Sequence, residues 1–204
     1  MQATRIIAVD PNQPAPSLLA EAVALLAQGE PVIVPTETVY GLACRPDVPG
    51  AVERVYQAKG RPEDKPLPRM VAELEHVRTA ITDWPETAAR LAQAYWPGPL
   101  TLVLRTAEGT IGFRIPDHPV MQALLKQASV PLAVTSANRS GTPETRTAEE
   151  AAASLHGSVA LALDAGPVRI AVPSTVVDLS GSGLRILREG AISAADILRV
   201  AEQH

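Results

Sequence analysis

The sequence predicts an α/β protein, α+β in some classification schemes, with one domain over residues 1–204 and one mixed β-sheet. Helix-like and strand-like patterns alternate along most of the chain, which is typical of helical crossovers between neighbouring strands. Some strand-like segments follow each other without a helix, as at 100–104 and 111–115, and these favour antiparallel pairing. The sequence contains no repeat, no low-complexity segment and no interdomain linker. We therefore expect parallel and antiparallel pairs within a single sheet.

The first elements are predicted from short apolar runs and from the residues that bound them. Residues 5–9 form a strand-like run, and the next segment repeats leucine and alanine at helical spacing, with Ser17 as N-cap and Gly29 at its end. Residues 31–34 predict a buried strand. The elements predicted next are a helix over 49–58, a strand over 67–71, and helices over 74–79 and 86–95.

The second half of the chain continues the alternation. A turn around Gly109 separates the strands predicted over 100–104 and 111–115. The elements expected after this hairpin are a helix over 120–128, a strand over 131–134, a helix after Thr147, strands over 159–163, 174–179 and 184–187, and a terminal helix capped by Ser193.

Composition and charge exclude several classes of protein. At 204 residues, 46% of them hydrophobic, the chain can bury a core without disulfides or metals. Its single cysteine, Cys44, excludes an internal disulfide and a multi-cysteine zinc site. No segment has the length of a membrane span or the pattern of a signal peptide, so we expect a cytoplasmic protein that does not contact membranes. The net charge of -4 argues against general binding to DNA or RNA.

The standard catalytic and nucleotide signatures are also missing. The sequence has no G-x-x-x-x-G-K-[ST] loop, no H-E-x-x-H and no G-x-S-x-G, and its G-S-G at 181–183 lacks the third glycine of a dinucleotide loop. The four histidines are dispersed, without the spacing of metal ligands. Any nucleotide must therefore bind in a different way.

Two of the three lysines lie in one short segment, K-G-R-P-E-D-K-P-L at 59–67. Arg61 precedes a proline, which favours an extended backbone, and in an extended run side chains two apart point the same way. Lys59 and Arg61 would then lie on one side, where converging cations suit a polyanion such as a triphosphate. A solvated surface loop is the alternative.

Polar residues interrupt the predicted apolar strands, or directly follow them, at four further places. Arg114 lies inside a strand, where burial would require an anionic partner. Turn-forming residues and surface ion pairs could explain each place separately, but one shared cleft explains them together. The residues concerned are Thr36, Thr38, Tyr40, Arg114, Ser136, Asn138, Ser174, Thr175 and Arg188.

These segments resemble the YrdC-like threonylcarbamoyl-AMP synthases over about residues 15–198. The resemblance rests on seven motifs in family order. They are P-T-E-T-V-Y-G-L at 35–42, K-G-R-P with K-P-L at 59–67, W-P-G-P-L-T at 96–101, R-x-P-x-H-P at 114–119, S-A-N at 136–138, S-T-V-V-D at 174–178 and I-L-R at 186–188. The resemblance implies a twisted open sheet with flanking helices and a deep cavity.

The same resemblance implies an enzyme that joins L-threonine, bicarbonate and ATP into threonylcarbamoyl-AMP and pyrophosphate, toward threonylcarbamoyladenosine in transfer RNA. Transfer RNA would be reached indirectly, through later enzymes. Lys59 and Arg61 are the implied catalytic residues at the phosphates. The implied threonine site consists of Thr38, Arg114, Ser174 and the backbone near Val134. The implied ATP site consists of Arg61, Lys65, Thr110, Ser136, Asn138, Glu144 and Arg188. Mg²⁺ would arrive with ATP, with no protein ligand assigned.

The residue types suggest how such a site would work. Arg114 offers a planar, bidentate fork for the threonine carboxylate, and cations with Mg²⁺ would offset the charge of the leaving pyrophosphate. Many relatives carry a histidine where this chain has Met70, so Thr38 and Ser174 must supply the remaining recognition. A same-fold paralogue with another carbamoyl or nucleotide activity and a non-enzymatic RNA-binding module are the alternatives.

Overall fold

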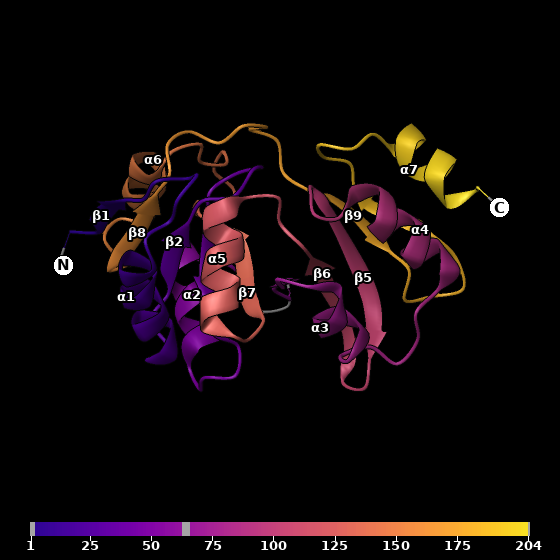
Figure 1. Ribbon diagram of the computed structural model, residues 1–204, viewed down its shortest axis with the longest axis horizontal. Coiled ribbons are helices and arrows are strands. Elements are labelled where there is room, and N and C mark those ends of the chain that lie inside the picture. The colour runs from indigo at the N-terminus through magenta and orange to yellow at the C-terminus, as the bar shows by residue number, and fades with distance from the viewer. Residues whose placement is uncertain (1–2, 63–65, 204) are drawn as a thin grey trace.

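The computed structural model describes residues 3–62 and 66–203, whose strands form one ten-stranded mixed sheet with helices packed on it (Figure 1). The strands follow the spatial order β1-β8-β2-β3-β7-β4-β6-β5-β9-β10. Their bounds are β1 Arg5–Ala8, β2 Val32–Val34, β3 Gly41–Cys44, β4 Arg69–Met70, β5 Leu100–Thr106, β6 Gly109–Arg114, β7 Leu132–Ser136, β8 Leu161–Asp164, β9 Thr175–Asp178 and β10 Arg185–Arg188. The helices are α1 Pro16–Ala27, α2 Ala51–Lys59, α3 Leu74–Arg78, α4 Glu86–Tyr95, α5 Pro119–Ala128, α6 Ala148–Ser154 and α7 Ala194–Ala201.

The mixed character of the sheet confirms the predicted fold class. Parallel pairs join β1 to β8, β2 to β8, β4 to β6 and β5 to β9, and the other neighbours pair antiparallel. The hairpin of β5 and β6 turns at Gly109, as predicted, with Thr106 opposite Gly109. None of the helices in the described part of the chain is both long and apolar enough to cross a membrane.

Most helices match their predictions closely, and the differences have local causes. Thr147 and Ser193 are the N-caps of α6 and α7, and their side chains accept the backbone N–H groups of Glu150 and Asp196. Ser17 is not a cap, because α1 already begins at Pro16, whose fixed φ suits the first turn of a helix. The strand β3 was not predicted, since its sequence G-L-A-C has little β propensity.

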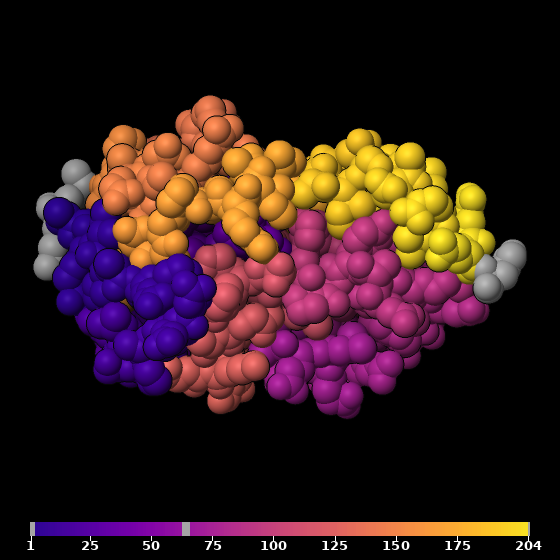
Figure 2. Space-filling model, turned by 45° about the horizontal axis from the view of Figure 1, so that its top comes forward, coloured from indigo at the N-terminus to yellow at the C-terminus, as the bar shows by residue number. Residues whose placement is uncertain are grey.

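The core consists of three apolar clusters separated by the sheet. One lies between α1, α5 and the strands β2, β7 and β8, and another lies between α2, α6 and the opposite side of that part of the sheet. The third lies between α4, α7 and the strands β5, β6 and β9. Figure 1 shows α1 and α5 in one half of the elongated molecule and α4 and α7 in the other. Figure 2 shows the indigo N-terminal residues and the yellow C-terminal residues at opposite ends.

The strand β5 shows why a polar site can form in the middle of this sheet. Leu100, Leu102 and Leu104 are fully buried in the cluster beneath α4 and α7. Successive side chains of a strand point to opposite faces, so Thr101 and Val103 point away from that core. Helices α4 and α7 therefore anchor one face of β5 and leave the other available for a cavity.

Candidate active site

A cavity of about 420 Å³ lies on the face of β5, β6 and β9 opposite to the α4 and α7 cluster, and it extends to β4, β7 and the segment before β3. Alternate residues of β5, β6 and β9 line it, as the two-residue period of a strand requires, whereas β7 contributes three consecutive residues at its end. The sheet contributes Thr101 and Val103 from β5, Thr110, Gly112 and Arg114 from β6, Val176 and Asp178 from β9, Met70 from β4, and Val134, Thr135 and Ser136 from β7.

The cavity brings together nine of the twelve residues that the sequence singled out as site residues. These nine are Thr38, Arg61, Thr110, Arg114, Val134, Ser136, Glu144, Ser174 and Arg188. Lys59 and Asn138 do not line it, and Lys65 lies outside the described residues. The cleft expected from polar residues at several strand ends is therefore present.

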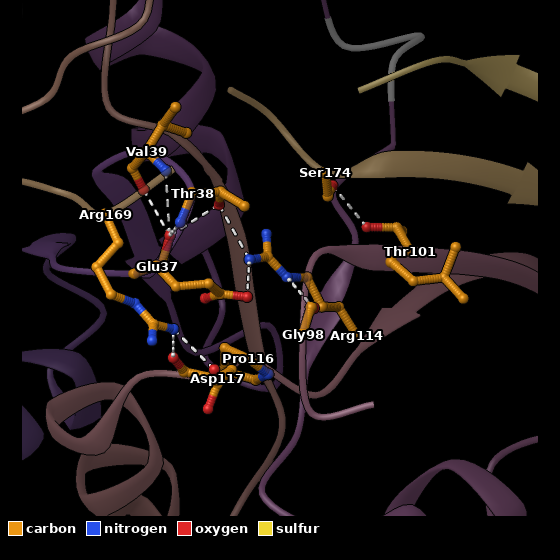
Figure 3. Close-up of polar contacts among 12 residues, drawn as sticks. Glu37, Thr38, Val39, Gly98, Thr101, Arg114, Pro116, Asp117, Arg169 and Ser174 are labelled. Carbon is orange, nitrogen blue, oxygen red and sulfur yellow. Dashed lines mark hydrogen bonds and ion pairs between the residues drawn. The ribbon is translucent and has the colours of Figure 1, made fainter. Parts of the chain in front are cut away.

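Arg114 is buried, with 4% of its surface exposed, and an ion pair holds it in place. Its Nη2 donates to Glu37 Oε1 at 2.7 Å and to Thr38 Oγ1 at 2.9 Å, and its Nε donates to the carbonyl of Gly98 at 3.1 Å. Figure 3 shows the other terminal nitrogen, Nη1, turned away from Glu37 and Thr38. The anionic partner predicted for a buried arginine is thus Glu37, a residue of the protein itself.

This geometry corrects the expectation of a bidentate fork for a ligand. A guanidinium has five N–H donors, and those of Nε and Nη2 already have partners within the protein. A carboxylate in the cavity can therefore reach only Nη1. The correction concerns the mode of binding, since Arg114 still faces the cavity.

The hydrogen bonds of two threonines fix the direction of one hydroxyl group. Thr36 Oγ1 donates to the carbonyl of Val39 at 2.7 Å, and a hydroxyl has only one proton to donate. In the 2.9 Å contact between Thr36 Oγ1 and Thr38 Oγ1, Thr38 must therefore be the donor. Because Thr38 Oγ1 also accepts from Arg114, it has no proton left for a ligand. Thr38 can only accept a hydrogen bond in the cavity.

Ser174 and Thr101 form a second hydroxyl pair with the opposite capability. Their oxygens are 2.9 Å apart, and Arg188 Nη2 donates to Ser174 Oγ at 3.2 Å and to the Ser174 carbonyl at 2.8 Å. The two hydroxyl groups have two protons, and the hydrogen bond between them uses only one, so the other proton remains available. Both residues line the cavity, and the pair can donate one hydrogen bond to a ligand.

Lys59 lies one layer behind the cavity wall, and only 2% of its surface is exposed. Its ammonium donates to the carbonyl of Ser136, to the carbonyl of Asn138 at 2.5 Å and to Asn138 Oδ1 at 3.4 Å. These contacts use all three of its N–H groups. The expectation that Lys59 contacts phosphates directly is therefore wrong for this geometry, and Lys59 instead anchors the segment 136–138.

Burial also changes the acid–base behaviour of the cations. Burial and, less strongly, the nearby charge of Arg61 together lower the pKa of Lys59 to about 8, while Glu144 opposes the shift. Burial lowers the pKa of Arg188 as well, again opposed by Glu144. Without a carboxylate in direct contact, Lys59 is only partly charged near pH 8.

At the end of the cavity lined by Arg61 and residues 66–68, Arg61 donates weakly to the carbonyl of Pro66 at 3.5 Å. Arg61, Arg188 and Glu144 all line this space. Three further lining residues were not singled out as site residues: Thr101 and Asp178, which lie within two of the family motifs, and Met70, which lies three residues after the K-P-L leucine. Thr101 and Asp178 could have been found from the sequence, because each lies two positions from another lining residue of its strand, Val103 and Val176.

Metal binding by the protein alone does not fit this site. The described residues contain no group of three or more histidine, cysteine, aspartate or glutamate side chains that could hold a metal ion. Asn138 Oδ1 accepts from Lys59, and its amide donates to the carbonyl of Thr142 at 2.6 Å. Mg²⁺ prefers carboxylate and phosphate oxygens, so an ion at this site would depend on the phosphates of a bound nucleotide.

Two of the relatives found by comparison with known proteins have the same kind of name. A threonylcarbamoyl-AMP synthase of Bacillus subtilis is 40% identical over 88% of this chain, and the chain spans 55% of that protein. A putative threonylcarbamoyl-AMP synthase of Mycobacterium tuberculosis is 38% identical, over 94% of this chain and 92% of the relative. The chain spans about half the length of the Bacillus relative and most of the Mycobacterium relative.

A solved structure and a family model agree with these relatives. The crystal structure of Pyrococcus abyssi Sua5 complexed with L-threonine superposes with a TM-score of 0.91 and is 36% identical, over 97% of this chain and 61% of that one. A family model named Sua5, YciO and YrdC, with the description "Telomere recombination", matches residues 24–190. Since the match covers most of the sequence and includes all the strands around the cavity, this chain belongs to the Sua5/YciO/YrdC family.

Proposed function

We propose that this chain makes threonylcarbamoyl-AMP and pyrophosphate from L-threonine, bicarbonate and ATP, for the threonylcarbamoyladenosine modification of transfer RNA. One cavity carries the proposal, because it has a carboxylate-binding group, Arg114, in the same space as two further arginines, Arg61 and Arg188. The names of the relatives support the same activity.

The threonine end of the cavity offers groups that match an amino acid. Arg114 Nη1 and the spare proton of the Ser174 and Thr101 pair are donors, which suit the carboxylate. Thr38 is an acceptor only and therefore suits an N–H or O–H of the ligand. Val134 and Met70 supply the apolar wall. Threonine would then bind with its carboxylate between Arg114 and Ser174 and a polar hydrogen toward Thr38.

The ATP end would use the remaining cations. Arg61 and Arg188, with Lys65, are the residues we assign to the phosphates, and Thr110, Ser136 and Glu144 line the same space. Asn138 contributes through its place beside Ser136. Mg²⁺ bound to the phosphates would neutralise part of their charge. Lys59 acts indirectly, because it holds the carbonyls of Ser136 and Asn138.

The reaction then depends on placement and charge. The amine of threonine attacks bicarbonate, a C–N bond forms and water leaves, which gives a carbamate. A carbamate oxygen attacks the α-phosphorus of ATP, and the bond to the bridging oxygen of pyrophosphate breaks. Holding the carbamate in line with that bond is the main contribution of a rigid cavity. Arg61 and Arg188 stabilise the negative charge that develops on the leaving group.

Mass spectrometry of a reaction containing the protein, ATP, Mg²⁺, bicarbonate and L-threonine tests the proposal. We expect threonylcarbamoyl-AMP, together with pyrophosphate release that requires both threonine and bicarbonate. If omitting threonine or bicarbonate left the pyrophosphate release from ATP unchanged, that result would refute the synthase activity and indicate a nucleotidase. Binding of ATP without any product would favour a same-fold paralogue, and binding of transfer RNA without nucleotide binding would favour an RNA-binding module.

A further inference from the structure

Glu37 is the buried counter-ion of the arginine that faces the cavity, yet it does not line the cavity itself. Only 1% of its surface is exposed. Its Oε1 accepts from Arg114 Nη2 at 2.7 Å. Figure 3 shows Glu37 on one side of the Arg114 guanidinium, with Nη1 on the other. Glu37 therefore makes no direct contact with a ligand in the cavity, and it acts on the ligand through its hold on Arg114 and through its charge.

The environment of Glu37 is poorly suited to a purely structural ion pair. Its second oxygen, Oε2, is buried and has no hydrogen-bond partner among the described residues. The Nδ1 atom of His118 is likewise buried without a partner. Burying a carboxylate costs free energy, and hydrogen bonds to both of its oxygens are needed to offset that cost. Buried polar groups without hydrogen-bond partners are rare in folded proteins. A buried carboxylate with one oxygen satisfied by the protein is therefore a candidate for a role beyond the ion pair.

The position of Glu37 has two consequences for the guanidinium. It occupies Nη2 together with Thr38, which leaves Nη1 as the nitrogen that faces the cavity. It also places a negative charge beside the cation that an incoming carboxylate needs. Two carboxylates that share one guanidinium repel each other through a poorly screened medium, which opposes binding of the second.

We propose that Glu37 is a positioning residue: it holds the Arg114 guanidinium in one orientation through Nη2, and its charge beside that guanidinium weakens the binding of L-threonine. This inference rests on the proposed function, because it takes an amino-acid carboxylate as the ligand of Arg114. Weak binding of substrate favours turnover when the substrate is abundant, since interactions made equally in the ground and transition states do not raise the rate.

The test compares the wild type with Glu37→Gln, which removes the charge and keeps an oxygen that can accept from Nη2. Calorimetric titrations use L-threonine, L-threonine methyl ester and ATP. We expect L-threonine to bind roughly 10-fold more tightly to Glu37→Gln, because the competing charge is gone. The methyl ester, which lacks the anionic carboxylate, should show no gain, and the affinity for ATP should stay unchanged.

The matched control is Asp117→Asn, which removes a carboxylate from the exposed ion pair with Arg169. It should leave all three affinities unchanged. Glu37→Asp, which keeps the charge, should show no tighter binding of threonine. Threonine affinity that is unchanged or weaker in Glu37→Gln, or a gain of equal size with the methyl ester, would overturn the inference.

Loss of the counter-ion could also prevent Glu37→Gln from folding in the absence of ligand. The measurement is then the refolding yield with saturating L-threonine or with the methyl ester. We expect rescue by threonine alone, because its carboxylate replaces the missing charge, and failure of that rescue would refute the role. If the wild type itself does not bind threonine, the proposed function fails at its threonine site. Equal binding of threonine by the wild type and Glu37→Gln would instead refute only the role of Glu37.

Discussion

Replacing Arg114 with alanine should separate the threonine end of the cavity from the ATP end. The change removes the donor Nη1 that faces the cavity. A hydrogen bond to a charged group contributes about 1.5–3 kcal/mol, so the Kd for threonine should rise by roughly 10- to 150-fold. The Kd for ATP should change by less than about 3-fold, since Arg61 and Arg188 remain. Calorimetric titration of each ligand measures both values.

The same substitution should also destabilise the fold, because it leaves Glu37 buried and unpaired. Removing one partner of a buried ion pair costs about 3–5 kcal/mol, which urea unfolding can measure. Arg169→Ala is the control, since that arginine and its partner Asp117 are 66% and 57% exposed and should contribute less than about 1 kcal/mol. Unchanged threonine affinity in folded Arg114→Ala would show that the carboxylate binds elsewhere in the cavity.

Three further substitutions test other parts of the site. Arg61→Ala should lower activity by about 10-fold or more, the scale of one charge-assisted hydrogen bond, and an altered melting temperature with normal activity would contradict this role. Thr36→Val should free the Thr38 proton and weaken threonine binding by roughly 3- to 10-fold with ATP binding intact, as titration can check. In the folded protein the pKa of Lys59 is about 8, below the ordinary lysine value of about 10.4. Between these two pH values Lys59 is therefore protonated more fully in the unfolded chain than in the folded protein. The free energy of unfolding of the wild type, relative to Lys59→Met, should therefore rise by up to about 3 kcal/mol from pH 8 to 10.5, and parallel pH profiles would refute the shift.

The sequence indicated the cavity because its residues follow the period of a strand. Thr38, Ser136 and Ser174 each lie at or beside the end of a predicted strand, and Arg114 lies inside one. Antiparallel and parallel pairing then brings β3, β7, β6 and β9 into one sheet. Local patterns therefore predicted the fold class, and together with the family resemblance they named nine of the residues that line the cavity.

Two features depended on contacts between distant parts of the chain and could not be predicted locally. Glu37 and Arg114 are 77 positions apart, and nothing in P-T-E-T-V distinguishes a buried glutamate from an exposed one. Lys59 was expected to face the cavity from an extended segment, but it is the last residue of helix α2. Gly60 follows in the left-handed conformation, which ends the helix and removes the two-residue alternation that the prediction assumed.

The two most buried cations near the cavity are compensated in different ways, and this difference suggests different roles. Arg114 is a guanidinium whose partner is the buried carboxylate of Glu37. Lys59 meets carbonyl and amide oxygens, which are neutral, and burial lowers its pKa to about 8. A group that must attract a substrate carboxylate needs a permanent charge, whereas a group that holds two backbone carbonyls needs only N–H donors, which a neutral amine retains in part. Arg114 therefore suits direct ligand binding, and Lys59 suits the support of Ser136 and Asn138 behind the cavity wall.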